Sequence, residues 1–407
     1  MRALLRNVTL WSLTLGHFCT DMLAGAMPIV VGLYLKDTLH LDLTQIGLLL
    51  GAYKLTSSLT QPIFGYLSDR YGGRWFAVGG VLWLAILQGL VGFMPTFGSA
   101  TLVAALAGFG SAAFHPQGAS GANIAAGAQK TGGVAMFMLG GNVGYAIGPI
   151  LAALVMSLFG VHGTWILASI ALVIVPMLYS LTGQAQPTSV DTKKAANWKL
   201  ELNPLFTTTA IVALILVMSL RAWSQESFST FMPQFFVDIA HFGKGEASLL
   251  STTMLFVLAF GSFTGGMLAD RVGPAKVMLT SMLISAPLMA LMFWLGDWRA
   301  FWVAPFIGFA SGAAWPPMLV MAQSLFHKNA GVGSGVALGF VFAMGGLGLQ
   351  LTGWMAEPEH LGLRIAMLSL CVIPLVSAGL VFLLPSAQRK PTTTSVVAPM
   401  SVAAVEG

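Results

Sequence analysis

Long apolar runs alternate with short polar or Pro/Gly-marked turns along almost the whole chain. A run of about 20 apolar residues is long enough to cross a bilayer as an α-helix. Because hydrocarbon offers the backbone no hydrogen-bond partner, runs of this length must be helical. The pattern predicts an all-α membrane protein with twelve transmembrane helices. The predicted spans are residues 9–35, 44–67, 75–95, 98–121, 132–158, 163–182, 206–236, 247–269, 275–296, 300–326, 331–355 and 362–385.

One polar stretch, residues 183–205, is the only break long enough to join two bundles, and it contains Lys193, Lys194 and Lys199. Six predicted spans precede it and six follow it. The sequence therefore predicts an N-terminal six-helix bundle, a cytoplasmic linker, a C-terminal six-helix bundle and a disordered cytoplasmic tail rich in Thr, Ser and Val. These four parts are residues 1–182, 183–205, 206–387 and 388–407.

Two sequence patterns occur once in each half. Residues 108–118 read GFGSAAFHPQG and residues 308–318 read GFASGAAWPPM, while residues 65–72 read GYLSDRYG and residues 266–273 read GMLADRVG. Two hydrophobic halves built on one template are typical of secondary transporters, whose substrate site lies near the bilayer midplane where the halves meet. The repeat predicts two pseudo-symmetric six-helix bundles around a central site.

The composition excludes a soluble protein. Hydrophobic residues make up 56% of the chain, charged residues only 8%, and the mean hydropathy is +0.82. The net charge of +5 does not indicate a nucleic-acid partner, because the basic residues are sorted by membrane side. With both termini in the cytoplasm, most loop Lys and Arg residues lie inside, as the positive-inside rule requires. The loop residues left outside are Lys36, Lys244, Arg299 and Arg364.

Signatures of an enzyme are missing from the sequence. It has no Walker A loop, no GxSxG element and no cluster with metal-ligand spacing. Cys19 and Cys371 both fall in apolar spans and are interpreted as reduced core residues. We therefore expect no enzymatic activity, no cofactor and no metal, and an ion gradient rather than ATP as the energy source.

Ionisable residues inside the spans are few. Placing such a group in the membrane costs about 2.5 to 3.5 kcal/mol on insertion scales, which makes each one a functional candidate. Nearly all Asp and Glu residues fall in loops, tails or helix ends. The intramembrane set is His17, Asp21, Lys54, His115, Arg221 and Glu226.

His17 and Asp21 lie four residues apart in the first span and therefore share one helix face. A carboxylate and an imidazole at this spacing can hydrogen-bond and hold one proton between them. We expect this pair to load and release the proton that drives transport. The alternative is a structural pair that closes the first helix against a neighbour.

Charged residues of the second and seventh spans are candidates for the substrate cavity. Arg221 would attract an anionic substrate, because guanidinium groups pair well with carboxylates and phosphonates. Lys54 could face Asp21 or Glu226. The alternative is that Arg221 and Glu226 lie near an extracellular mouth or pair structurally.

His115 lies at mid-span before Pro116 in the first copy of the longer repeat. A proline within a span frees a backbone carbonyl, so this position predicts a broken helix that lines a cavity. His115 and Gln117 have no polar counterpart in the second copy, where Trp315 and Pro317 stand. We expect the unpaired polar groups to contact substrate or proton, although His115 could instead be a satisfied core residue.

Residues 65–74 read GYLSDRYGGR and resemble the signature loop of the major facilitator superfamily, and residues 266–276 resemble its second-half counterpart. With twelve spans and a central loop, this resemblance implies that these elements gate the cytoplasmic side without contacting substrate. The alternative is that their charges only set the topology. The residues concerned are Gly65, Asp69, Arg70, Gly72, Arg74, Asp270 and Arg271.

Residues 140–149 read GGNVGYAIGP and resemble the antiporter motif of drug exporters in this superfamily. Gly144, Gly148 and Pro149 match its core, whereas Ala152 and Ala153 stand where that motif usually has two glycines. The resemblance implies exchange of substrate against protons. Tight helix packing by small residues explains the same pattern without any functional direction.

Several segments together resemble the bacterial fosmidomycin resistance protein family, namely residues 17–21, 55–62, 114–116, 140–144 and 339–348. This resemblance implies an inner-membrane exporter of small molecules driven by proton antiport. The chain departs from the family at Gln117, where relatives have glutamate, and at Ala104, where drug antiporters often have arginine. The residues expected to line or tune the cavity are Lys54, His115, Gln117, Asn142, Arg221 and Glu226.

The leading interpretation is a monomeric, proton-coupled exporter of a small polar or amphipathic molecule, such as a drug or metabolite, in the bacterial inner membrane. Its partners are the substrate, protons and the lipid bilayer. A second interpretation is a proton-coupled importer or a uniporter of a small metabolite, favoured by the missing charges in the fourth span. A third is a transporter-like membrane sensor or scaffold.

Overall fold

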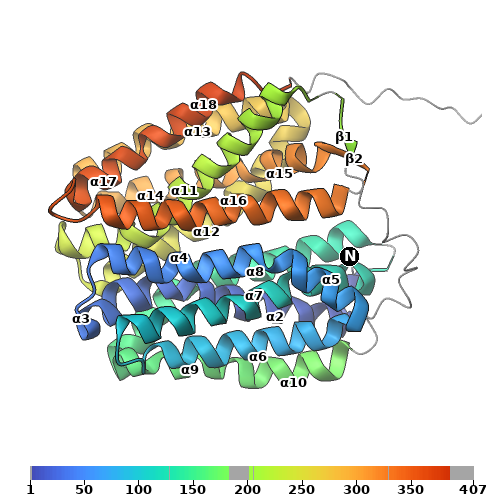
Figure 1. Ribbon diagram of the computed structural model, residues 1–407, viewed down its shortest axis with the longest axis horizontal. Coiled ribbons are helices and arrows are strands. Elements are labelled where there is room, and N and C mark those ends of the chain that lie inside the picture. Colours follow the sequence, from blue (N-terminus) through green and yellow to red (C-terminus); the bar gives the residue numbers. More distant parts are fainter. Residues whose placement is uncertain (1, 128, 183–200, 205, 329, 386–407) are drawn as a thin grey trace, which may run out of the picture.

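The computed structural model describes residues 2–127, 129–182, 201–204, 206–328 and 330–385 (Figure 1). The predicted tail 388–407 and most of the predicted linker lie outside the described residues. We call residues 2–182 the N-terminal half and residues 201–385 the C-terminal half. In Figure 1 the helices of the two halves form a lower and an upper group.

The N-terminal half consists of helices joined by short turns in its described residues. A π-helix, η1, continues α2 after Pro28, which lacks the backbone N–H of a regular ladder. The elements are α1 (Arg2–Leu5), α2 (Val8–Ile29), η1 (Val30–Leu35), α3 (Lys36–Leu39), α4 (Leu43–Leu59), α5 (Gln61–Tyr71), α6 (Gly73–Val91), α7 (Phe97–Ala125), α8 (Lys130–Phe159), η2 (Val161–Gly163), α9 (Thr164–Ser169) and α10 (Ala171–Leu181).

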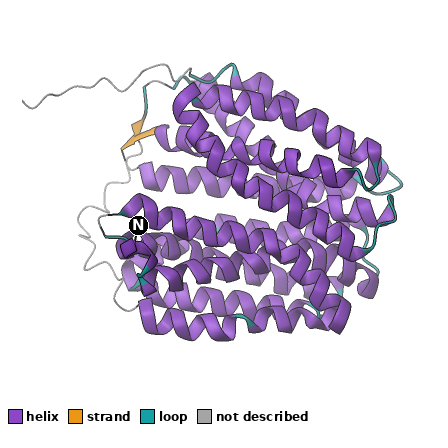
Figure 2. Cartoon of the chain, turned by 180° about the vertical axis from the view of Figure 1, so that it is seen from behind, coloured by secondary structure: helices purple, strands orange, loops and turns teal. Residues whose placement is uncertain are grey.

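The C-terminal half repeats this helical arrangement and adds one short antiparallel strand pair, β1 with β2. Figure 2 shows that the strand pair and the N-terminus lie at the same end of the molecule. The elements are β1 (Glu201–Leu202), α11 (Thr208–Asp238), α12 (Lys244–Val272), α13 (Pro274–Leu295), α14 (Ala300–Ala313), α15 (Trp315–Ser324), β2 (Phe326–Lys328), α16 (Ala330–Met355), α17 (Gly362–Leu370) and α18 (Val372–Val381).

The predicted all-α membrane fold is confirmed, with the strand pair as its one addition. Among the described residues, 10 helical segments are long and apolar enough to cross a membrane. The two other predicted spans, residues 44–67 and 331–355, coincide with α4 plus α5 and with α16. The arrangement is consistent with the twelve predicted helices.

Corresponding turns in the two halves have the same backbone conformation, which explains part of the shorter repeat. Gly72 ends α5 at φ 100°, and Gly273 ends α12 at φ 98°. Residues with a side chain rarely adopt this conformation, so both copies of the repeat require glycine at their last position. The gating role implied for these loops stays a prediction.

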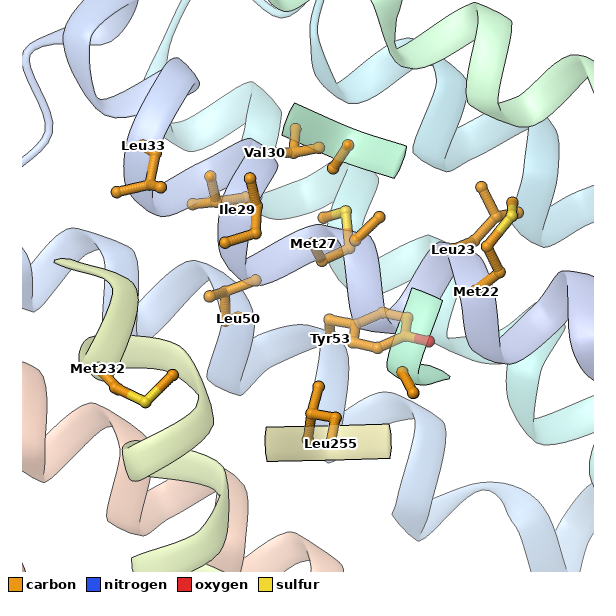
Figure 3. Close-up of a cluster of buried hydrophobic side chains, with 14 of the residues drawn as sticks. Met22, Leu23, Met27, Ile29, Val30, Leu33, Leu50, Tyr53, Met232 and Leu255 are labelled. Atoms are coloured by element: carbon orange, nitrogen blue, oxygen red, sulfur yellow. The ribbon is translucent and has the colours of Figure 1, made fainter. Parts of the chain in front are cut away.

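Apolar side chains of both halves share one core. Figure 3 draws Met22, Leu23 and Tyr53 of the N-terminal half together with Met232 and Leu255 of the C-terminal half, and Tyr53 lies beside Leu255. All five are buried members of the same cluster. The halves therefore meet through packed side chains of α2, α4, α11 and α12 around the region that holds the intramembrane charges.

Helices α2 and α8 approach each other closely through a row of glycines. A Cβ at Gly144 would lie 2.2 Å from the carbonyl oxygen of Phe18, and one at Gly148 would lie 2.5 Å from that of Met22. A Cβ at Gly25 on α2 would in turn lie 2.2 Å from the carbonyl oxygen of Tyr145. The residues that resemble the antiporter motif thus form a small-residue helix contact, and this contact fixes the face of α2 that carries His17 and Asp21.

Candidate functional site

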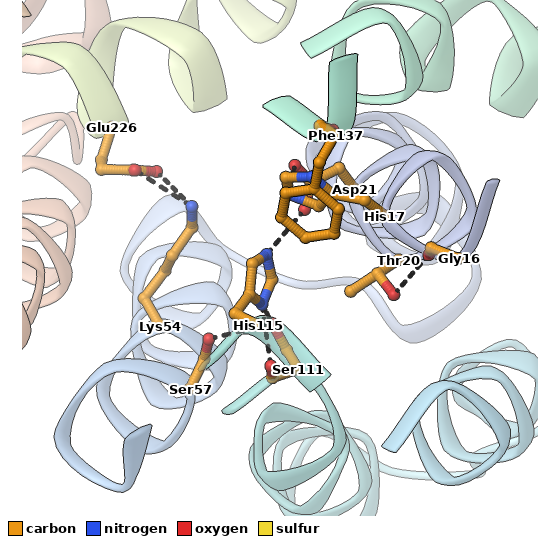
Figure 4. A network of polar contacts seen from close by, with 10 residues as sticks. All are labelled: Gly16, His17, Thr20, Asp21, Lys54, Ser57, Ser111, His115, Phe137 and Glu226. Atoms are coloured by element: carbon orange, nitrogen blue, oxygen red, sulfur yellow. Dashed lines mark hydrogen bonds and ion pairs between the residues drawn. The ribbon is translucent and has the colours of Figure 1, made fainter. Parts of the chain in front are cut away.

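Three ionisable side chains from two helices meet in the N-terminal half (Figure 4). Asp21 on α2 contacts His17 of the same helix, with Oδ2 3.1 Å from Nε2. Its other oxygen, Oδ1, lies 3.1 Å from Nε2 of His115 on α7. We call His17, Asp21 and His115 the His–Asp–His triad. The predicted His17–Asp21 pair is present, and His115 completes it from 94 residues away.

Backbone carbonyls fix the orientation of both imidazole rings. Nδ1 of His17 lies 2.9 Å from the carbonyl oxygen of Phe137, and Nδ1 of His115 lies 2.8 Å from that of Ser111. A carbonyl oxygen only accepts, so each Nδ1 must carry the hydrogen of its bond. Each Nε2 then faces a carboxylate oxygen, and each of these two contacts needs a hydrogen of its own. The triad is therefore arranged to hold two shared protons between one carboxylate and two imidazoles.

Neighbouring residues make room for the triad and cover one side of it. The Phe137 ring stacks on His17 at a centroid distance of 4.1 Å. Gly141 leaves space for the pair, since a Cβ there would lie 2.5 Å from His17 Nε2 and 2.6 Å from Asp21 Oδ2. The His17 side chain is 5% exposed, whereas those of Asp21 and His115 are 21% and 27% exposed. The triad is therefore more accessible on the side of Asp21 and His115 than on that of His17.

The helix break predicted at Pro116 is wrong. Helix α7 runs without interruption from Phe97 to Ala125 with the proline inside it. The corresponding span of the other half does break after Ala313, directly before Pro316 and Pro317. A single proline removes one backbone donor, which a long helix tolerates, whereas two consecutive prolines remove two.

Lys54 on α4 forms an ion pair with Glu226 on α11, which joins the two halves. Its Nζ lies 3.0 Å from Oε1 and 2.9 Å from Oε2 of Glu226. The structure thus pairs Lys54 with Glu226 rather than with Asp21. Figure 4 shows Lys54 between Glu226 and the triad.

We predict that Glu226→Gln destabilises the fold by about 2 kcal/mol, because it leaves the charge of Lys54 half-buried and unpaired. The double variant Lys54→Gln with Glu226→Gln should recover most of this loss, since neither charge remains. Chemical unfolding of the purified protein measures both. A double variant as unstable as the sum of the two single variants would contradict this account of the pair.

The side chain of Arg221, on α11, contacts residues of its own half and none of the triad. Its Nη2 donates to the carbonyl oxygen of Ser311 at 2.8 Å, and the guanidinium lies 5.1 Å from the ring centre of Trp315. Its role in a substrate cavity therefore stays a prediction, and its surroundings place it apart from the triad.

Gln117 and Asn142, also predicted for the cavity, have different surroundings. The Gln117 side chain donates to Ser68 Oγ on α5, which links α7 to the helix before the signature loop. Gln117 also fills the space beside Gly73, at the start of α6. Asn142 is half-buried on α8. The structure brings neither side chain to the triad.

Residues of the two signature loops lie at the end of the molecule that holds the N-terminus. Arg74 donates to the carbonyl oxygen of Tyr179 and lies 4.1 Å from the centre of its ring. Asp270 and Arg271 are exposed, and neither forms an ion pair with a described residue. The side chain of Asp69 lies outside the described part of the structure. Gating by these loops stays a prediction.

The sequence interpretation missed a set of polar contacts that joins the halves at the opposite end. Lys36 Nζ lies 2.6 Å from Asp238 Oδ2, and Lys244 Nζ lies 2.5 Å from Asp37 Oδ2. Glu357 accepts hydrogen bonds from the backbone and hydroxyl of Thr44 at 2.6 and 2.9 Å. Lys36 and Asp37 lie at the start of α3, whereas Asp238 ends α11 and Lys244 begins α12. Each half therefore contributes one lysine and one aspartate to these two pairs. The structure is therefore closed at the predicted extracellular end.

We predict that Lys36→Glu slows transport several-fold, because it places two acidic groups opposite each other and weakens closure at this end. Adding Asp238→Lys should restore the rate by re-forming the pair with reversed charges. Arg299→Glu is the matched control, since the Arg299–Asp297 pair lies within one half. Rates of uptake into membrane vesicles measure the effect. A double variant no faster than Lys36→Glu alone would contradict the prediction.

The described residues contain one group that could hold a metal ion. His17, Asp21 and His115 offer ligand atoms that lie within 4.8 Å of one another. The direct contacts of 3.1 Å between nitrogen and oxygen are hydrogen-bond distances. Shared protons account for this arrangement with the residues present.

Comparisons with known proteins identify the family of the chain. The family model of the Major Facilitator Superfamily matches residues 13–245 and 214–404. The chain is 29% identical to the fosmidomycin resistance protein of Escherichia coli (strain K12), over 92% of each chain. It is 30% identical to the uncharacterized MFS-type transporter YfnC of Bacillus subtilis (strain 168), over 92% of this chain and 91% of that one.

Among solved structures, a bacterial homolog of the human lysosomal transporter Spinster, in an inward-facing and occupied conformation, superposes with a TM-score of 0.77. The match covers 92% of this chain and 95% of that chain at 18% sequence identity, so it supports the fold alone. The family model and the curated relatives identify the family, and the solved structures support its fold. The chain belongs to the Major Facilitator Superfamily, whose members are transporters of small molecules and not enzymes.

Proposed function

We propose that the protein is a secondary active transporter that exports a small polar or amphipathic molecule in exchange for protons. The exchange proceeds by alternating access, in which two six-helix domains, residues 1–182 and 206–387, rock around a central site. The proposed location is the bacterial inner membrane, with both termini in the cytoplasm and one chain as the working unit.

The observation that carries this proposal is the orientation of the two imidazoles. Both Nδ1 atoms are committed to backbone carbonyls, so both Nε2 atoms are directed at the two oxygens of Asp21. A purely structural ion pair needs only one contact between an imidazole and the carboxylate. A carboxylate between two imidazoles can instead take up and release protons while its partners stay in place.

The Lys54–Glu226 pair links the rocking of the two domains to the protonation of the triad. In the state described, Glu226 balances the charge of Lys54. When the halves separate at this level, Lys54 loses that partner and its positive charge acts on the triad alone. A like charge disfavours the protonated imidazoles, so the change of conformation promotes release of a proton.

Substrate binding is assigned to the space between the halves near Lys54 and Asp21. Similarity to a fosmidomycin resistance protein over most of the chain makes fosmidomycin the first compound to test.

Growth in fosmidomycin tests the proposal in cells. An Escherichia coli strain without its own fosmidomycin resistance protein should tolerate more of the compound when it expresses this chain, and should accumulate less of it. The direction of flux in inside-out vesicles under an imposed pH gradient separates export from import. Uptake into inside-out vesicles indicates export, and loss of preloaded compound from them indicates import.

A further inference from the structure

A small cavity lies inside the C-terminal half, apart from the triad. Its volume is about 30 Å³, which exceeds the roughly 10–15 Å³ that a single water molecule needs. It lies among α11, α12, α13, α14 and α18. Its wall contains the charged side chain of Arg221, the amide of Gln225 and several serine side chains, among them that of Ser377.

Arg221 brings an unbalanced positive charge to this cavity. Its guanidinium carries five N–H donors, and one nitrogen donates to the carbonyl oxygen of Ser311. Trp315 lies against one face of the group. Within the described ranges, no carboxylate forms an ion pair with Arg221, and the carboxylate of Glu226, five residues further along α11, is paired with Lys54. A cation in such a place requires a counter-charge or water.

A second unsatisfied group lies in the same wall. Ser377 on α18 is 1% exposed, and its Oγ has no hydrogen-bond partner among the described residues. Leaving a buried hydroxyl unpaired costs about 1 to 3 kcal/mol, so an occupant of the cavity that accepts its hydrogen would stabilise the fold. Arg221 and Ser377 come from α11 and α18, so they converge on the cavity from two sides.

We propose that this cavity binds a small monovalent anion of the size of chloride or nitrate. An anion accepts hydrogen bonds from both the guanidinium and the serine hydroxyl, and it balances the charge of Arg221. The volume limits the occupant to a few heavy atoms. The site is independent of proton coupling, because it lies within one half and shares no residue with the triad.

Thermal unfolding of the purified full-length protein tests the proposal. Sodium chloride and sodium nitrate are titrated at constant ionic strength against sodium gluconate, whose anion is too large for the cavity. Because a ligand that binds only the folded state raises the unfolding temperature, chloride or nitrate should give a saturating rise that gluconate does not give. A wild-type protein without this difference overturns the proposal.

Two substitutions locate the site. Arg221→Gln should weaken anion binding by about tenfold or more, and Ser377→Ala by about threefold, from the usual strengths of charged and neutral hydrogen bonds. Arg364→Gln is the matched control, since Arg364 also combines one carbonyl contact with one aromatic ring but does not line the cavity. Arg364→Gln should keep the saturating rise.

An unchanged anion response in Arg221→Gln overturns the proposal. If that variant does not fold, equilibrium dialysis with radioactive chloride compares wild type with Ser377→Ala. Equal binding by these two proteins, or no binding by wild type, also overturns it.

Discussion

Asp21→Asn should abolish proton-driven transport while the protein keeps its fold. The asparagine amide cannot take up or release a proton in the physiological range, so the triad loses its exchangeable centre. The amide still offers one donor and one acceptor to the two imidazoles, whose Nδ1 bonds to the backbone are unaffected. We therefore expect a change in unfolding free energy of about 1 kcal/mol or less.

Transport of fosmidomycin into inside-out vesicles measures the loss, which should reach the level of vesicles without the protein. Asp297→Asn is the matched control. Hydrogen bonds from Arg299 lower the pKa of the exposed Asp297 carboxyl, so it stays ionised at neutral pH and has no proton to exchange. This control should transport like wild type. Undiminished gradient-driven transport by Asp21→Asn would refute the role of Asp21.

Gly144→Val should destabilise the fold by forcing two packed helices apart. A Cβ at this position would lie 2.2 Å from the backbone carbonyl oxygen of Phe18, and a backbone atom cannot move aside as a flexible side chain can. Helices α2 and α8 must separate, which affects the neighbouring contacts at Gly148 and Gly25. Overpacking of this kind costs about 1 to 3 kcal/mol and sometimes more.

Thermal unfolding of purified variants measures this effect. Gly79→Val is the matched control, because Gly79 also lies within a long helix, α6, but a Cβ there meets nothing within 4 Å. Both variants introduce the same β-branched residue, so the difference between them reports the contact with α2. Equal unfolding temperatures would show that the glycines of residues 140–148 do not set this helix distance.

Most of the fold could be predicted from the sequence because membrane-spanning helices are determined locally. The length of an apolar run and the need to pair every backbone group inside the bilayer are sufficient to locate a helix. The two repeats indicated the pseudo-symmetry of the halves, and the turns at Gly72 and Gly273 share the same backbone conformation. The continuous helix at Pro116 was not predictable, because neighbouring helices decide whether a proline breaks a span.

The contact between two of the three triad residues could be predicted in the same way. His17 and Asp21 are four residues apart, so helical periodicity alone brings them together. His115 joins them from α7, and no local pattern indicates which face of α7 meets α2. Gly141 leaves room for the triad, but the sequence does not distinguish it from the other glycines of residues 140–149. The Lys36–Asp238 and Asp37–Lys244 pairs depend on how the halves dock, which the charges alone do not specify.

The most direct test of proton coupling follows both solutes in one experiment. Proteoliposomes that contain the protein and an internal pH-sensitive dye receive a gradient of the compound that the growth test identifies, with no initial pH gradient. The account predicts that the compound and protons move in opposite directions, so that the internal pH changes with wild type and not with Asp21→Asn. Movement of the compound by wild type without any change in internal pH would contradict it.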